Sequence, residues 1–124
     1  MAAELTVLRN RSDFLAANRG LRVARPGFVL LTGPNEGLGL RYGITVTKRI
    51  GNAVARNRMK RRLRELARAI LPVEGLADHD HVLIGRTGGV ERDFARMRAE
   101  LSAALERAKA GEGDPPRRKD RAKR

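Results

Sequence analysis

Apolar residues recur at helical spacing in the middle of the chain. Between residues 52 and 71 they lie three or four positions apart, which is the pattern of a helix that buries one side. The predicted buried positions are Ala55, Met59, Leu63, Leu66 and Ile70. Asn52 is a favourable N-cap residue, and Pro72 is expected to end the helix at about Leu71.

Two further helices are predicted on either side of this segment. Ser12 is a favourable N-cap for a short helix that would continue to about Arg19 and end at Gly20. A last helix is predicted from about Glu91, again from the helical spacing of its apolar residues. Its predicted buried positions are Val90, Phe94, Met97, Leu101, Ala104 or Leu105, and Ala108.

Three apolar runs are predicted to be strands. Residues 28–32 have the composition of a buried strand, residues 33–39 are rich in turn formers, and residues 40–48 are expected to be a second strand. We expect these two strands to form an antiparallel hairpin with a long loop. Residues 81–85 are predicted to be a third strand, whereas residues 20–27 are expected to be a connector.

The alternation of polarity in the second strand predicts two different sheet faces. Ile44 and Val46 are expected to face one side, and Thr45 and Thr47 the other. A polar sheet face beside a basic helix would form a groove that a flexible strand could occupy. Alternatively, this face is simply exposed to solvent, as is common in antiparallel sheets.

The net charge of the chain indicates that this protein binds an anionic partner. The 124 residues include 27 basic and 14 acidic residues, which give a net charge of +13. Residues 1–110, which we predict to be a single domain, hold 21 of the bases and 11 of the acids, and so carry +10. Residues 111–124 lack large apolar groups and are expected to be a disordered basic tail.

Basic residues are concentrated on the predicted central helix. Residues 56–68 contain seven bases and one acid. Four of the bases, spaced four residues apart, form a row along one side: Arg56, Lys60, Arg64 and Arg68. Like charges at this spacing destabilise a helix by roughly 0.2–0.5 kcal/mol per pair. A polyanion lying against the row would relieve the repulsion, so the pattern predicts a nucleic-acid partner.

The sequence offers no self-sufficient active site. It has no cysteine, which excludes disulfides and thiolate metal sites. In Asp78-His79-Asp80-His81, alternation would put histidines and aspartates on opposite sides, so a polar strand entrance fits this segment better than a metal site. No phosphate-binding loop or dinucleotide motif appears, and no small-molecule substrate is expected. No apolar run reaches the roughly 20 residues of a membrane span, and no signal peptide is apparent, so we expect a cytoplasmic protein.

The segment from Lys48 to Arg64 resembles the signature of the bacterial ribonuclease P protein subunit. The matching residues are Lys48-Arg49-Ile50-Gly51-Asn52-Ala53-Val54, Arg56-Asn57-Arg58, Lys60-Arg61 and Arg64. A looser resemblance extends from about Leu8 to Lys109. Its clearest matches are Asp13-Phe14, Phe28-Val29-Leu30, Arg41-Tyr42-Gly43-Ile44 and Val82-Leu83-Ile84.

This resemblance implies an α/β fold of the α+β sandwich type, in which helices pack on a small mixed sheet. It also implies a left-handed βαβ crossover, against the general right-handed preference. Members of the family are the protein subunit of an endonuclease that removes the 5′ leader of precursor tRNA. Catalysis resides in a large RNA, where Mg²⁺ is bound, and the protein alone is inactive. The implied partners are therefore the catalytic RNA and precursor tRNA.

The resemblance also assigns residues to the two RNAs, but no catalytic residue or metal ligand. Those assigned to the catalytic RNA are Arg56, Asn57, Arg58, Lys60, Arg61 and Arg64, with Arg68 continuing the row. Those assigned to the leader are Phe14, Thr45, Thr47, Lys48 and Arg49. Family members often carry aromatic residues where this chain has Asn18 and Leu31. Leader binding is therefore expected to rest more on Phe14, on charge and on the threonine hydroxyls.

Two other functions are compatible with the composition. A basic structural protein of the ribosome would share the size, the charge and the absence of cysteine, but the ordered signature favours the ribonuclease P subunit. A nuclease that acts without RNA is disfavoured because the carboxylates are scattered. The RNA that copurifies with the protein would distinguish these functions. A single large RNA would support the ribonuclease P subunit, and ribosomal RNA would support the ribosomal protein.

Overall fold

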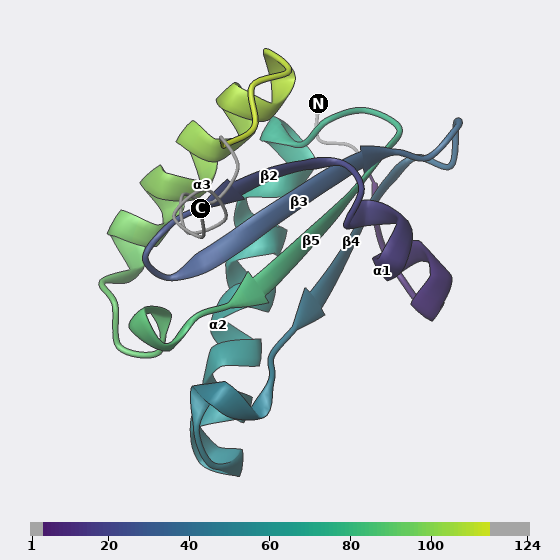
Figure 1. Cartoon of the computed structure of the whole chain (residues 1–124). Coiled ribbons are helices and arrows are strands. Elements are labelled where there is room, and N and C mark those ends of the chain that lie inside the picture. The colour runs from purple at the N-terminus through teal and green to yellow at the C-terminus, as the bar shows by residue number, and fades with distance from the viewer. Residues whose placement is uncertain (1–3, 115–124) are drawn as a thin grey trace, which may run out of the picture.

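The computed structural model describes residues 4–114 and shows a mixed sheet with helices on both faces (Figure 1). The elements in chain order are β1 (Leu5–Val7), α1 (Arg11–Ala17), β2 (Leu21–Ala24), β3 (Phe28–Pro34), β4 (Leu40–Thr45), α2 (Ala53–Glu74), β5 (His79–Gly85) and α3 (Phe94–Lys109). Short 3₁₀ turns follow β4 and β5, namely η1 (Lys48–Ile50) and η2 (Thr87–Gly89). The predicted α/β fold, with helices packed on a mixed sheet, is confirmed.

The five strands have the order β1-β4-β5-β3-β2. β5 lies between β3 and β4, antiparallel to the first and parallel to the second, so the predicted hairpin of β3 with β4 is wrong. Val82 and Leu83 point to opposite faces of β5 and both are buried. A strand that is apolar on both faces belongs in the middle of a sheet. α2 joins the parallel neighbours β4 and β5 and passes behind the sheet in Figure 1, which makes this crossover left-handed.

The two edge strands are the elements that the sequence pattern does not predict. Residues 20–27, expected to be a connector, contain β2, which pairs with β3 along its whole length. β1 pairs with only the first half of β4, and its last pair is Val7 with Tyr42. Three or four residues are too few for a two-residue period to be recognised. Within residues 4–114, no strand pairs with the outer edge of β4 beyond Tyr42.

α2 and α3 cover one face of the sheet and enclose the larger core. The buried side of α2 includes the predicted Met59, Leu63, Leu66 and Ile70, and the predicted Ala55 is half-buried against the same core. The buried positions of α3 are Met97, Leu101, Ala104, Leu105 and Ala108. The helical spacing of the apolar residues is thus confirmed for both helices. α3 itself begins three residues later than predicted.

The ends of α2 are set by one predicted and one unexpected feature. The Asn52 side chain accepts a hydrogen bond from the Ala55 amide (2.9 Å), as expected of an N-cap. At the other end the helix does not stop before Pro72 but continues to Glu74. Pro72 is tolerated in this last turn, where the Gly75 amide still donates to the Leu71 carbonyl (2.8 Å).

α1 covers only part of the opposite sheet face. It begins after Asn10 and ends at Ala17, so the predicted cap Ser12 lies inside its first turn. Beneath it is a smaller core of Leu8, Ala17, Val29, Leu31 and Val82. The Phe14 ring also packs here, over Gly43, where an added Cβ would be 2.5 Å from two ring carbons. Gly43 therefore permits the close approach of α1 to the sheet.

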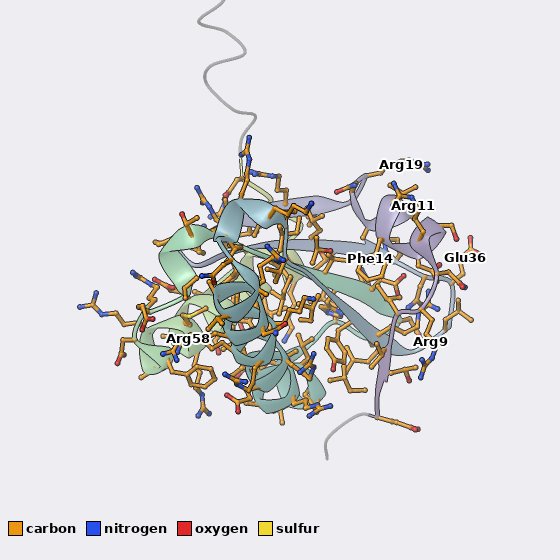
Figure 2. The ribbon with its side chains drawn as sticks, turned by 90° about the horizontal axis from the view of Figure 1, so that it is seen from below. Arg9, Arg11, Phe14, Arg19, Glu36 and Arg58 are labelled. Carbon is orange, nitrogen blue, oxygen red and sulfur yellow. The ribbon has the colours of Figure 1, made fainter. Side chains whose placement is uncertain are left out.

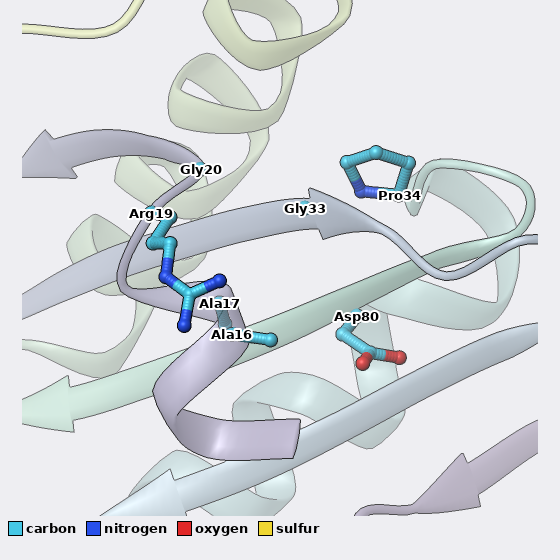
Figure 3. Close-up of a pocket in the computed structure, with 7 residues that line it drawn as sticks. All are labelled: Ala16, Ala17, Arg19, Gly20, Gly33, Pro34 and Asp80. Carbon is cyan, nitrogen blue, oxygen red and sulfur yellow. The ribbon is translucent and has the colours of Figure 1, made fainter. Parts of the chain in front are cut away.

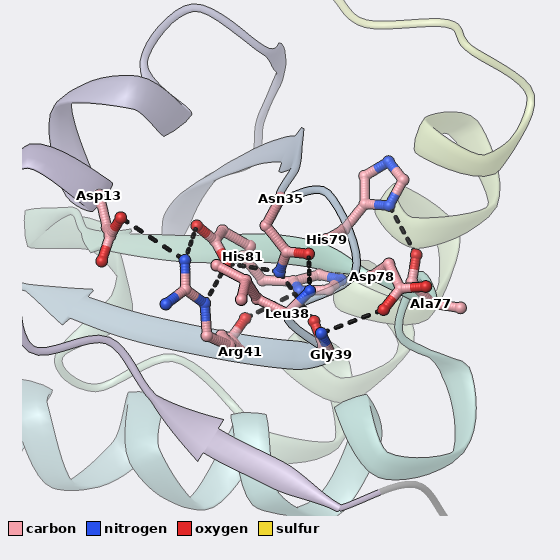
Figure 4. A network of polar contacts seen from close by, with 10 residues as sticks. Asp13, Asn35, Leu38, Gly39, Arg41, Ala77, Asp78, His79 and His81 are labelled. Carbon is pink, nitrogen blue, oxygen red and sulfur yellow. Dashed lines mark hydrogen bonds and ion pairs between the residues drawn. The ribbon is translucent and has the colours of Figure 1, made fainter.

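An ion pair fastens α1 to the sheet (Figure 4). The Arg41 guanidinium donates two hydrogen bonds to the Asp80 carboxylate (2.8 and 2.9 Å) and lies 3.5 Å from Asp13 of α1. The Asn35 side chain donates a further hydrogen bond to Asp80 (2.9 Å). The pKa of Arg41 is raised above its ordinary value, mainly by the hydrogen bond to Asp80. The paired carboxylate is only 8% exposed, so it depends on these donors.

His81 joins the opposite face of β5 to the loop after α2. Its Nδ1 donates to the Arg41 carbonyl (3.1 Å), and its Nε2 accepts a hydrogen bond from the Leu76 amide (3.0 Å). Burial of the ring lowers its pKa to about 4, so the side chain is neutral at pH 7. Asp80 and His81 thus face opposite sides, as predicted. Within residues 4–114, no three His, Cys, Asp or Glu side chains are placed to share a metal ion.

Residues 111–114, predicted as the start of a disordered tail, instead lie against β2. The Asp114 amide donates to the Arg22 carbonyl (2.6 Å), and the Ala24 amide donates to the Asp114 carboxylate (2.7 Å). The prediction is wrong here because an edge strand leaves backbone groups free for such contacts. Residues 115–124 of the predicted tail lie outside the described residues.

Protonation of His81 is expected to destabilise the fold below neutral pH. The ring has a pKa of about 4 in the fold against about 6.5 in the unfolded chain, so the unfolded chain takes up the proton first. Stability is therefore complete above pH 6.5 and falls as the pH drops toward 4, by on the order of 3 kcal/mol. Urea unfolding between pH 4 and 7.5 should show a smaller loss for H81Q than for the wild type. Equal losses would contradict the buried neutral histidine.

Removal of the Arg41 side chain is expected to cost far more stability than removal of the Asp13 charge. R41M leaves the buried Asp80 carboxylate without its ion partner, at a cost of about 3 kcal/mol. D13N removes only the longer and more exposed contact, at a cost below about 1 kcal/mol. Urea unfolding at pH 7 measures both. Similar values for the two variants would show that the buried Arg41–Asp80 pair, which joins β4 to β5, contributes no more than the Arg41–Asp13 contact to α1.

Candidate nucleic-acid interface

The side of α2 that faces away from the sheet carries many exposed polar side chains. The predicted RNA-binding residues that are exposed are Asn57, Arg58, Lys60, Arg61, Arg64 and Arg68, and Arg56 is half-buried. The side chains of Lys60, Arg61, Arg64 and Arg68 form no hydrogen bond or ion pair with the residues that the structure describes. Their charges are therefore available to an external anion.

Arg56 and Arg58 contact the protein as well as solvent. Arg56 donates to the Gly51 carbonyl (2.7 Å), which holds its side chain along the first turn of α2. Arg58 donates to the Val90 carbonyl (3.1 Å) and pairs with Glu91 (3.1 Å), although it remains 44% exposed. A guanidinium has five N–H donors, so both arginines keep donors for a phosphate. These contacts fix the direction in which the remaining donors point.

Arg62 is a basic residue of the same helix that turns inward. It donates to the Gly89 carbonyl (3.1 Å) and to the Arg92 carbonyl, and it lies over the Phe94 ring, 5.7 Å from the centroid. The side chain thereby fastens the segment between β5 and α3 to α2. Its position beside Leu63, at the border of the buried stripe, is the sequence signal for this inward orientation.

Beyond α1, the open sheet face contains a cavity of about 860 Å³ at the ends of β4 and β5. Its lining includes Thr47, Lys48 and Arg49, which were predicted to bind the leader. Two unpredicted bases also line it, Arg22 of β2 and Arg86, which directly follows β5. Arg22 lies on the edge strand β2, and Arg86 is separated from β4 in the chain by all of α2, so the sheet order brings both bases to this cavity.

A second cavity, of about 520 Å³, lies at the outer edge of β4 beyond the end of β1. It is lined by Arg9, Arg11, Phe14, Ile44, Thr45, Val46 and Lys60. The predicted leader residues are thus divided, with Phe14 and Thr45 here and the others at the first cavity. Lys60 of α2 reaches this cavity, so the two predicted sets of residues adjoin. Figure 2 shows Arg9, Arg11 and Phe14 on one side of the molecule and Arg58 on the other.

Asn18 and Leu31, the positions at which the resemblance implies aromatic residues in other members of the family, lie in different environments. Asn18 directly follows α1 and is exposed, whereas Leu31 is 4% exposed and buried beneath α1. An RNA base could therefore stack on a side chain at position 18 but not at position 31 without displacing α1. Phe14, half-buried and packed over Gly43, is the aromatic ring that this face offers to a base.

A small cavity under α1 does not extend this surface. It has a volume of about 140 Å³ and is lined by Ala16, Arg19, Pro34 and Asp80, among others (Figure 3). Ligand pockets usually measure about 300–1,000 Å³, and the Asp80 carboxylate is already paired with Arg41. Among the described residues, no helix is both long and apolar enough to cross a membrane.

Comparison with known sequences identifies close relatives. A family model described as Ribonuclease P matches residues 3–109. The ribonuclease P protein component of Erythrobacter litoralis is 69% identical over 121 residues, which cover 98% of this chain and 100% of the relative. That of Paramagnetospirillum magneticum is 41% identical over 116 residues, which cover 89% of this chain and 87% of the relative.

Solved structures of similar proteins share the fold. The RNase P protein of Staphylococcus aureus matches with a TM-score of 0.70 and 28% identity, over 88% of this chain and 100% of that one. The RNase P protein of Thermotoga maritima matches with a TM-score of 0.67 and 33% identity, over 81% of this chain and 94% of that one. Sequence, fold and the basic surface agree, and the chain belongs to the ribonuclease P protein family.

Proposed function

We propose that this protein binds the catalytic RNA of ribonuclease P along α2 and the 5′ leader of precursor tRNA on the open sheet face. The observation that supports this most is the continuity of the basic surface. Lys60 belongs to the row on α2 and also lines the cavity that contains Phe14 and Thr45. One surface can therefore hold two RNA segments next to each other.

The two parts of the surface suit different kinds of RNA. From Arg56 to Arg68 the row extends about 18 Å along a convex helix, at 1.5 Å per residue. A convex row of charges fits the phosphates of a folded RNA. The two cavities on the sheet instead combine basic groups with apolar ones, which are Ile84 in the larger cavity and Phe14 in the smaller one. Such a mixture fits a single strand, whose bases contact apolar groups while its phosphates meet cations.

In this proposal the chemistry belongs to the RNA. Mg²⁺ prefers oxygen ligands such as carboxylates, but within residues 4–114 no three acidic or histidine side chains are grouped so as to hold a metal ion. The buried Asp80 and the partly buried Glu100 are paired with Arg41 and Arg92. The donor set of the protein does not fit a magnesium site, so we place the Mg²⁺ on the catalytic RNA. The protein positions the leader and offsets phosphate repulsion. Its place of action would be the cytoplasm, with the tRNA precursors.

The purified protein alone is expected to show no cleavage of precursor tRNA. Addition of the cognate catalytic RNA should give cleavage at the 5′ end of the mature sequence, and the protein should stimulate it most at low Mg²⁺, where phosphate repulsion is least screened. Gel analysis of labelled precursor measures the products. Reproducible cleavage by RNA-free protein would contradict the proposal that the RNA is the catalyst.

Neutralisation of three exposed bases on α2 is expected to weaken RNA assembly without weakening the fold. The triple variant R61A/R64A/R68A should reduce the slope of log K against log salt by roughly two to three units, because each lost phosphate contact contributes just under one. Its stability should be equal or slightly higher, since like-charge repulsion is removed. Filter binding to the catalytic RNA at several salt concentrations, with thermal unfolding, measures both effects.

R62A is the matched control on the same helix. It removes one positive charge, but one that binds carbonyl groups of the protein. It should therefore lower the stability, by about 1–3 kcal/mol, and change the salt slope by less than one unit. If the triple variant unfolds and keeps the wild-type salt slope, the exposed bases are structural and the assignment of α2 to RNA is wrong.

A further inference from the structure

The turn after β5 is connected to α2 through Gly89. The Arg62 Nε of α2 donates to the Gly89 carbonyl (3.1 Å), and the Gly89 amide donates to the Arg86 carbonyl (2.8 Å). Two hydrogen bonds therefore lead from Arg62 to the residue that directly follows β5. Gly89 is buried, whereas Arg86 and Thr87 are exposed and line the 860 Å³ cavity. One end of this turn thus contacts α2, and the other forms part of the cavity wall.

Close packing transmits the position of Gly89 to Arg86. An added Cβ at Gly89 would lie 3.0 Å from the Gly27 Cα and 3.0 Å from the Met59 Cε, so the residue is enclosed between α2 and the chain before β3. The Arg86 amide also donates to the Gly27 carbonyl (3.1 Å). Gly89 and Arg86 therefore share a neighbour and a hydrogen bond, and a displacement of Gly89 moves Arg86 with it.

Arg62 is the side chain that holds Gly89 from the α2 side. Its guanidinium also donates to the Arg92 carbonyl and lies over the Phe94 ring. The Arg62 side chain is half-buried, and these donors are directed at the segment between β5 and α3. Loss of the donors would leave the buried Gly89 carbonyl without this partner. Because an unpaired buried carbonyl is costly, the turn would shift to bring the group to water or to another donor.

We propose that Arg62 is a positioning residue for the leader, which acts by setting the place of Arg86 and Thr87 at the 860 Å³ cavity. This inference rests on the proposed function. The Arg86 side chain uses one donor on the Arg25 carbonyl (3.0 Å) and keeps others for a phosphate. Hydrogen bonds of this kind are made at about 2.7–3.2 Å, so a shift of the turn by roughly 1 Å would break the contact with the leader. Arg62 therefore serves the leader, although its neighbours on α2 serve the catalytic RNA.

The affinity for precursor tRNA relative to mature tRNA tests the proposal, because only the precursor carries a leader. This affinity ratio is measured on the holoenzyme, at protein concentrations that saturate the catalytic RNA. R62M keeps apolar packing on Phe94 but removes the donors to the Gly89 and Arg92 carbonyls. It should lower the affinity ratio about three- to ten-fold.

R92M is the matched control. It also removes one positive charge from a half-buried side chain, together with the ion pair to Glu100, but it leaves the hydrogen bonds of Gly89 in place. Its affinity ratio should equal that of the wild type, whatever stability either variant loses. An equal reduction of the ratio by R62M and R92M would show that Arg62 is merely structural and would overturn the proposal.

The double variant R62M/R86A tests the route through Arg86. R86A alone should lower the affinity ratio, and R62M should then add less than about two-fold, because both substitutions affect one contact. Independent losses, or no effect of R86A, would overturn the proposal. If R62M melts below the assay temperature, R62K replaces it. Lysine keeps the charge but lacks the planar fork that binds two carbonyls, so the ratio should still fall. A wild-type holoenzyme that binds both tRNAs equally would instead overturn the proposed function.

Discussion

Burial of one side of α2 against the sheet allows the other side to carry its row of cations. Met59, Leu63 and Leu66 are fully buried, and burial of each such side chain stabilises by about 1.5–3 kcal/mol. A like-charge pair on the exposed side costs only roughly 0.2–0.5 kcal/mol. The core contribution therefore exceeds the repulsion several-fold, and the helix stays formed before any RNA binds. A helix that is already ordered loses little conformational entropy on binding.

The arginines of this chain differ in function because they differ in what they contact. Arg41 pairs with a buried carboxylate and Arg62 binds backbone carbonyls, so both belong to the framework. Arg61 and Arg64 lie on the same helix as Arg62 but are exposed, and no described residue pairs with them. One residue along a helix turns a side chain by about 100°, as the period of 3.6 residues requires. A count of basic residues alone would assign all of them to RNA.

Local sequence patterns predicted the structural features that depend on neighbouring residues, such as helices and caps. They did not predict how strands that are distant in the sequence pair with one another. The stripe and cap of α2 and the basic signature from Lys48 to Arg64 are local, and the helix and its exposed side follow from them. The places of β5 and β2 depend on pairing across the chain, which explains the wrong hairpin, the missed Arg22 and Arg86, and the wrong assignment of residues 111–114. The alternative function, a structural protein of the ribosome, is excluded because the relatives of this chain are ribonuclease P protein components.

The distribution of acids explains how a small protein keeps so much charge available. Asp80 is used on Arg41 and Glu100 on Arg92, both away from the exposed row of α2. Glu91 pairs with Arg58 but stays 77% exposed, so solvent weakens that pair. The unpaired cations act over about 8 Å at physiological salt. They therefore act only on RNA that lies directly against the protein. In the proposed complex, the arrangement of cations along α2 and around β4 would thus decide which RNA segments are held.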